Sequence, residues 1–95
     1  MAKRKIVWTN TANLERKDIL EYWILRNKSK RFSLRLNYLI LQTLEVLREN
    51  PTIGRRTNVD NVRIKLIRGY LLLYEFTVSE LIILSIWDAR RDIKK

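Results

Sequence analysis

Residues 62–76 read VRIKLIRGYLLLYEF, and their side chains follow a period of two. In the first half of this segment apolar side chains alternate with Arg63 and Lys65, which is the pattern of a half-buried strand. The dipeptide Arg68-Gly69 then has the length and the glycine of a tight hairpin connection. The segment therefore predicts an antiparallel β-hairpin whose returning strand covers residues 70–78.

The sequence on either side of this hairpin predicts further elements. Residues 81–87 form another apolar strand after a short turn, and residues 5–9 form a short strand near the N-terminus. Residues 51–54 predict a turn and residues 55–61 a polar loop. The last two strands are apolar on both faces, which indicates a partner site if one face is uncovered. The same pattern would also arise if these two strands lie in the centre of the sheet, or if the C-terminal tail folds over them.

Two helices are expected between the first strand and the hairpin. The first begins at a cap formed by Asn10 or Thr11 and ends at Asn27. The second follows after very few residues and ends where Asn50 precedes Pro51. Its core face is an apolar stripe at helical spacing, formed by Phe32, Leu36, Leu39, Ile40, Thr43, Leu44 and Leu47. A smaller apolar set lies on another face and consists of Leu34, Tyr38 and Leu41.

These elements together predict an α+β fold of order β-α-α-β-β-β. An N-terminal strand and a two-helix hairpin pack on a mainly antiparallel sheet of three to four strands. The length of 95 residues fits a single domain over residues 1–95, and no internal repeat or linker divides the chain.

The composition excludes several kinds of chemistry. Without cysteine the chain has no disulfide, thiolate nucleophile or zinc finger, and without histidine it lacks the usual general base and metal ligand. No glycine-rich phosphate loop or metal-ligand cluster is present, so we expect no cofactor and no metal. The longest apolar stretch, residues 81–87, is far too short for a membrane span, and no signal-peptide apolar region follows the N-terminus. We expect a cytoplasmic protein with no membrane partner.

The net charge of +10, from 20 Lys and Arg against 10 Asp and Glu, favours an anionic partner. The basic residues fall in three groups: Arg26, Lys28, Lys30, Arg31 and Arg35; Arg55, Arg56, Arg63, Lys65 and Arg68; and Arg90, Arg91, Lys94 and Lys95. Arg63 and Lys65 are two apart on a strand and project from one face. Together with a tyrosine of the next strand, these two cations could bind the phosphate backbone of a nucleic acid while the tyrosine ring stacks on a base. The alternative is that they simply form a solvated strand face. The residues by themselves support binding better than catalysis.

Short segments in a fixed order along the chain resemble one protein family. They are Ile6-Val7-Trp8-Thr9, Tyr22-Trp23, Leu44-Glu45-Val46-Leu47, Asn50-Pro51, Gly54-Arg55, Val62-Arg63-Ile64-Lys65, Gly69-Tyr70, Tyr74-Glu75 and Ile86-Trp87-Asp88-Ala89-Arg90-Arg91-Asp92. The ordered set resembles the RelE/ParE superfamily of toxins from bacterial toxin–antitoxin, or plasmid stabilisation, modules. The resemblance implies a toxin held inactive by a co-encoded acidic antitoxin that wraps around it, with a heterotetramer of the two as one assembly it allows.

The resemblance also implies one of two mechanisms. RelE-like members cleave messenger RNA in the ribosomal A site, whereas ParE-like members poison DNA gyrase and are not nucleases. Arg63 and Lys65 match the paired basic residues of the RNA-cleaving members, but Leu71 occupies the position of their catalytic arginine. The histidine or tyrosine that many of them place near the C-terminus is also missing. The ending Arg90-Arg91-Asp92 is similar to ParE-type members, with Asp88-Ala89 in place of their His-Gly.

The sequence therefore predicts a ParE-like toxin that binds a protein, with DNA gyrase as its target. A ribosome-dependent endoribonuclease and a basic nucleic-acid-binding domain unrelated to toxins are the alternatives. A nuclease would use Arg63, Lys65, Tyr74, Arg90 and Arg91. The antitoxin- or target-binding surface is expected on these residues: Arg55, Arg63, Lys65, Arg68, Tyr70, Leu72, Tyr74, Trp87, Arg90 and Arg91. An open apolar sheet face beside Arg63 and Lys65 would receive an acidic, amphipathic segment of the antitoxin.

Overall fold

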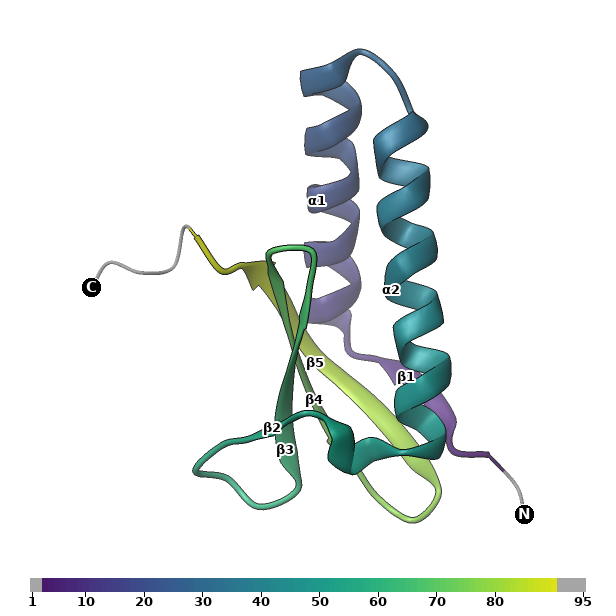
Figure 1. Cartoon of the computed structure of the whole chain (residues 1–95), viewed down its shortest axis with the longest axis vertical. Coiled ribbons are helices and arrows are strands. Elements are labelled where there is room, and N and C mark those ends of the chain that lie inside the picture. The colour runs from purple at the N-terminus through teal and green to yellow at the C-terminus, as the bar shows by residue number, and fades with distance from the viewer. Residues whose placement is uncertain (1–2, 91–95) are drawn as a thin grey trace.

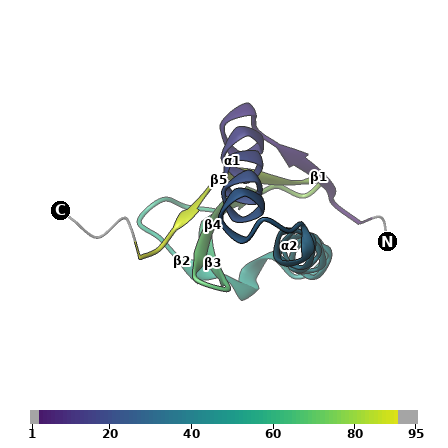
Figure 2. The same ribbon diagram turned by 90° about the horizontal axis from the view of Figure 1, so that it is seen from above.

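The computed structural model describes residues 3–90 and has the expected order of elements. Its helices and strands are β1 (Lys5–Trp8), α1 (Asn10–Asn27), α2 (Arg31–Glu49), the 3₁₀ helix η1 (Pro51–Ile53), β2 (Arg55–Arg56), β3 (Val62–Ile67), β4 (Tyr70–Phe76) and β5 (Glu80–Asp88). Figure 1 shows that the hairpin of α1 and α2 rises beyond the strands, and Figure 2 shows the two helices side by side. The predicted α+β class is confirmed.

The strands form one five-stranded sheet in the order β1-β5-β4-β3-β2. β1 pairs parallel to β5, and the other neighbours pair antiparallel. The prediction of three to four strands is too low, because a short strand begins the segment that was expected to be a loop. Arg55 and Arg56 in this segment pair with Ile64 and Arg63 of β3.

Thr9 positions α1 against the sheet. Its hydroxyl accepts a hydrogen bond from the Ala12 N–H at 3.1 Å and donates to the Ile83 carbonyl of β5 at 2.9 Å. The predicted caps, Asn10 and Thr11, are already helical, because the extended residue before the first turn is Thr9. One side chain thus caps the helix and joins it to the strand beside it.

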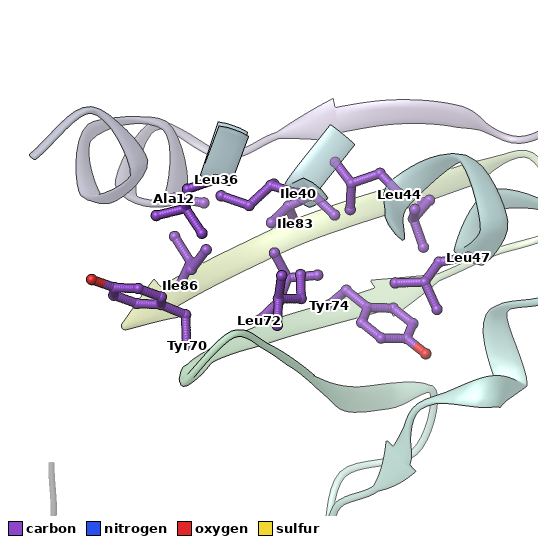
Figure 3. Packing of buried hydrophobic residues seen from close by; sticks show 12 residues of the cluster. Ala12, Leu36, Ile40, Leu44, Leu47, Tyr70, Leu72, Tyr74, Ile83 and Ile86 are labelled. Atoms are coloured by element: carbon purple, nitrogen blue, oxygen red, sulfur yellow. The ribbon is translucent and has the colours of Figure 1, made fainter. Parts of the chain in front are cut away.

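The core lies between the helices and one face of the sheet (Figure 3). Residues directly opposite each other on antiparallel strands share a face, so alternate residues of β4 and β5 point toward the helices. The buried set includes Tyr70, Leu72, Tyr74, Leu81, Ile83 and Ile86 from the strands and Ala12, Leu36, Ile40, Leu44 and Leu47 from the helices. The predicted stripe of α2 supplies most of the helical part. The smaller apolar set on α2, Leu34, Tyr38 and Leu41, is exposed.

Candidate functional site

Arg63 and Lys65 lie on the helix-facing side of β3. In the antiparallel pairing of β3 with β4, Arg63 is directly opposite Tyr74 and Lys65 is directly opposite Leu72, and both residues of β4 belong to the core. Since opposite residues share a face, the two cations project on the same side as the core. The prediction that they flank the open apolar face is therefore wrong. The register of the hairpin places Leu66, and not Lys65, on the other face.

The Arg63 side chain anchors the segment that precedes β2. Its guanidinium Nη1 donates to the carbonyls of Gly54 at 2.8 Å and Thr52 at 3.1 Å. The Tyr74 hydroxyl donates to the Pro51 carbonyl at 2.5 Å and accepts from the Gly54 N–H at 3.0 Å. These four hydrogen bonds fix η1 and Gly54 against the hairpin, so Arg63 and Tyr74 both have a clear structural role.

Three residues predicted to contact a partner lie in the core instead. Tyr70 is 4% exposed, and Leu72 and Tyr74 are fully buried. They are alternate residues of β4, and the helices cover the face from which they project. Burial raises the pKa of the Tyr74 phenol, although the Gly54 hydrogen bond and the charge of Arg63 lower it. The phenol therefore stays protonated at neutral pH, which leaves it unsuited to act as a base.

Leu71 lies on the opposite face of the sheet from Arg63 and Lys65. It is directly opposite Leu66 of β3 and Trp87 of β5. The superfamily resemblance places the catalytic arginine of RNA-cleaving members at this position. An arginine at position 71 would project away from the two cations of β3. The structure therefore does not bring these three positions together on one surface.

The sheet face turned away from the helical core is mostly apolar, although Glu75 also lies on it, opposite Ile82. We call its six partly or largely exposed apolar residues the outer apolar face: Ile64, Leu66, Leu71, Leu73, Ile82 and Trp87. The side chain of Leu66 is the most accessible of them, at 60% exposed. Contiguous exposed apolar surface of this kind is typical of a protein-binding site.

A groove with a volume of about 900 Å³ lies between α1, the start of β4 and the end of β5. Its walls include Tyr22, Trp23 and Arg26 of α1 together with Tyr70, Trp87 and Arg90. Trp23 Nε1 donates to the Tyr70 hydroxyl at 2.6 Å, and Arg90 Nε forms an ion pair with Asp88 Oδ1 at 3.1 Å. The groove thus joins three of the predicted binding residues.

The α1 side of this groove was missed by sequence reasoning. Glu15, Ile19, Tyr22 and Arg26 follow one another at intervals of four, three and four residues, so all four lie on one face of the helix. Glu15 Oε1 also accepts hydrogen bonds from the Ser85 hydroxyl at 2.8 Å and the Ile86 N–H at 3.0 Å. The helical spacing was the signal that could have found this face.

Three further arginines were predicted to bind a partner. Arg55 is exposed on β2, and Arg68 is exposed in the β3–β4 turn with φ 52°. Arg91 lies outside the described residues. Within residues 3–90 no group of three His, Cys, Asp or Glu side chains is placed to hold a metal ion. In that same part of the chain, no helix has the length and apolarity to cross a membrane.

Comparisons with known proteins bear directly on this arrangement. A family model described as "ParE toxin of type II toxin-antitoxin system, parDE" matches residues 6–93. A chain of the solved structure "Chromosomal ParDE TA system from P. aeruginosa" is similar at a TM-score of 0.73 and 19% identity, over 88% of this chain and 94% of that chain. At this identity the structural match shows a shared fold. None of the curated proteins compared with the chain matches it.

Proposed function

The chain belongs to the ParE toxin family of type II toxin–antitoxin systems, and from this premise we propose that it acts by binding DNA gyrase. The observation that carries the proposal is the identity of residue 71, because a leucine occupies the position at which the RNA-cleaving members of the superfamily have their catalytic arginine. A leucine side chain cannot donate the hydrogen bonds or supply the positive charge that stabilise a reacting phosphate. The missing arginine therefore favours binding over RNA cleavage as the mode of action.

The other residues also support binding over RNA cleavage. A ribonuclease of this kind must deprotonate a ribose hydroxyl and stabilise charge on the phosphate. Tyr74 is buried and protonated, Arg63 is held by backbone carbonyls, and the sequence contains no histidine. Neither Tyr74 nor Arg63 is therefore well suited to take a proton from RNA.

We further propose that a co-encoded antitoxin neutralises the chain through an acidic, amphipathic segment. The outer apolar face supplies the apolar surface that such a segment requires, and Leu66, at the β3 edge of this face, is largely exposed. The net charge of +10 favours an acidic partner and speeds its association. Gyrase and a co-encoded antitoxin would place the action of this protein in the cytoplasm.

Expression of the chain in a bacterium without its antitoxin is expected to arrest growth while translated messages stay intact. Primer extension on those messages provides the measurement, because ribosome-dependent cleavage produces stops within codons. Lys65→Ala is the matched variant, since no hydrogen bond or ion pair within residues 3–90 involves the Lys65 side chain. Stops that appear with the unmodified chain and vanish with Lys65→Ala would establish RNA cleavage and overturn the proposal.

A further inference from the structure

The end of the helical hairpin where α1 passes into α2, which lies beyond the strands in Figure 1, is rich in basic residues. We call six exposed basic residues the hairpin tip: Arg26, Lys28, Lys30, Arg31, Arg35 and Arg68. The first five belong to the last turn of α1, the connection and the first turns of α2, and Arg68 belongs to the β3–β4 turn. No Asp or Glu occurs between Glu21 and Glu45 in the sequence. The helical part of the tip therefore has no acidic residue of its own.

Three arginines of the hairpin tip face a common cavity. The cavity has a volume of about 330 Å³ and is lined by Asn27, Ser29, Arg31, Phe32, Arg35 and Arg68. The salt bridges within residues 3–90 all lie elsewhere, joining Lys3 with Glu49, Arg48 with Glu45 and Arg90 with Asp88. Like charges held together without a counter-charge repel one another and attract anions. Three arginines thus line one cavity, and none of them forms a salt bridge with an acidic residue of the described chain.

The backbone beneath the hairpin tip is firmly held. Lys28 takes a left-handed conformation, φ 53°, which turns the chain directly after α1. The Ser33 hydroxyl donates to the Leu20 carbonyl at 2.5 Å and ties α2 to α1. The rings of Trp23 and Phe32 pack across the two helices with centroids 4.9 Å apart. The backbone that carries the cations is therefore ordered before any ligand arrives, which lowers the entropic cost of binding.

We propose that the hairpin tip binds the phosphate backbone of duplex DNA. Arginine, which supplies four of the six cations, donates two parallel hydrogen bonds to a phosphate. Five of the six residues that line the cavity carry polar or charged groups, and three of these are arginines, which suits a ligand with regularly spaced negative charges. The choice of duplex DNA rests on the proposed function, because gyrase works on duplex DNA, and a projecting hairpin can reach DNA held by a bound enzyme.

Fluorescence anisotropy with the full chain and a labelled DNA duplex tests this proposal. The double variant Arg31→Gln/Arg35→Gln removes two tip cations, and Lys5→Gln/Lys17→Gln removes two exposed cations from elsewhere at the same net charge. We expect the tip variant to bind at least about tenfold more weakly, with a slope of log K against log[salt] reduced by about 1.8 if both phosphate contacts are lost. The control variant should stay within about twofold of the unmodified chain.

Several outcomes would overturn the proposal. Equal weakening in both double variants would show that net charge alone attracts the DNA, and an absence of binding at low salt would remove the site altogether. Competition against the labelled duplex gives a further test. If polyglutamate or single-stranded RNA displaces it as well as unlabelled duplex DNA does at equal charge, duplex DNA is excluded as the ligand.

A gyrase assay with the same variants separates this proposal from the proposed function. Tip-dependent DNA binding by a chain that leaves gyrase unaffected would support the phosphate site and contradict gyrase as the target. Inhibition of gyrase by a chain whose DNA binding does not depend on the tip would contradict the phosphate site alone.

Discussion

Replacing Gly54 by alanine is expected to lower the free energy of unfolding by about 2–4 kcal/mol, through overpacking and the loss of buried hydrogen bonds. A Cβ atom at position 54 would lie 2.4 Å from the Tyr74 hydroxyl oxygen and 3.0 Å from the Ile64 carbonyl oxygen. The Tyr74 ring is fully buried and its hydroxyl bonds to two backbone groups, so it cannot move aside without breaking them. Urea unfolding followed by circular dichroism measures the change.

A double-mutant cycle makes the Gly54 prediction specific. Tyr74→Phe removes the hydroxyl that meets the new Cβ, so Gly54→Ala should cost less in the Tyr74→Phe background than in the unmodified chain. Ile53→Ala is the matched control, because the neighbouring Ile53 side chain is 49% exposed. Equal costs of Gly54→Ala in both backgrounds would show that the hydroxyl does not constrain position 54.

Replacing Leu44 by alanine is expected to cost about 2–5 kcal/mol, as for other large-to-small changes in a core. Leu44 is fully buried in the middle of the stripe by which α2 packs on the sheet. Leu34→Ala on the same helix should change stability by less than about 0.5 kcal/mol, because Leu34 is 66% exposed. The two variants make the same chemical change on two faces of one helix.

Thermal unfolding distinguishes these two leucines clearly. For a domain of this size each kcal/mol shifts Tm by about 4–8 °C, so Leu44→Ala should unfold far below Leu34→Ala. Similar Tm values for the two variants would mean that both apolar faces of α2 are equally buried or equally exposed. Either result would contradict the packing of α2 on β4 and β5.

Local patterns were enough to predict most elements of this fold. The alternation around Arg63 and Lys65 predicted β3, and the structure places that strand at Val62–Ile67. The apolar stripe of α2 predicted its buried face, and Pro51 predicted its end, because both depend on neighbours in the sequence. The number of strands was underestimated because the two residues of β2 carry no strand pattern, and only β3 makes them a strand.

The candidate site was harder to predict, because it depends on which face of each strand the helices cover. The sequence showed that Tyr70, Leu72 and Tyr74 share a face, but it did not show whether that face meets the helices or a partner. The register of β3 on β4 decides that Arg63 joins this buried side, and a shift by one residue would reverse it. Which face of the hairpin the helices cover is set by contacts between distant segments, and these leave no mark in a local pattern.

Purified DNA gyrase tests the central claim most directly. Relaxed plasmid, gyrase and ATP are incubated with a saturating amount of the folded chain, and supercoiling is read on an agarose gel. The account predicts that supercoiling is lost, and that an excess of the co-encoded antitoxin restores it. Supercoiling that proceeds at its normal rate with saturating folded chain would contradict gyrase as the target.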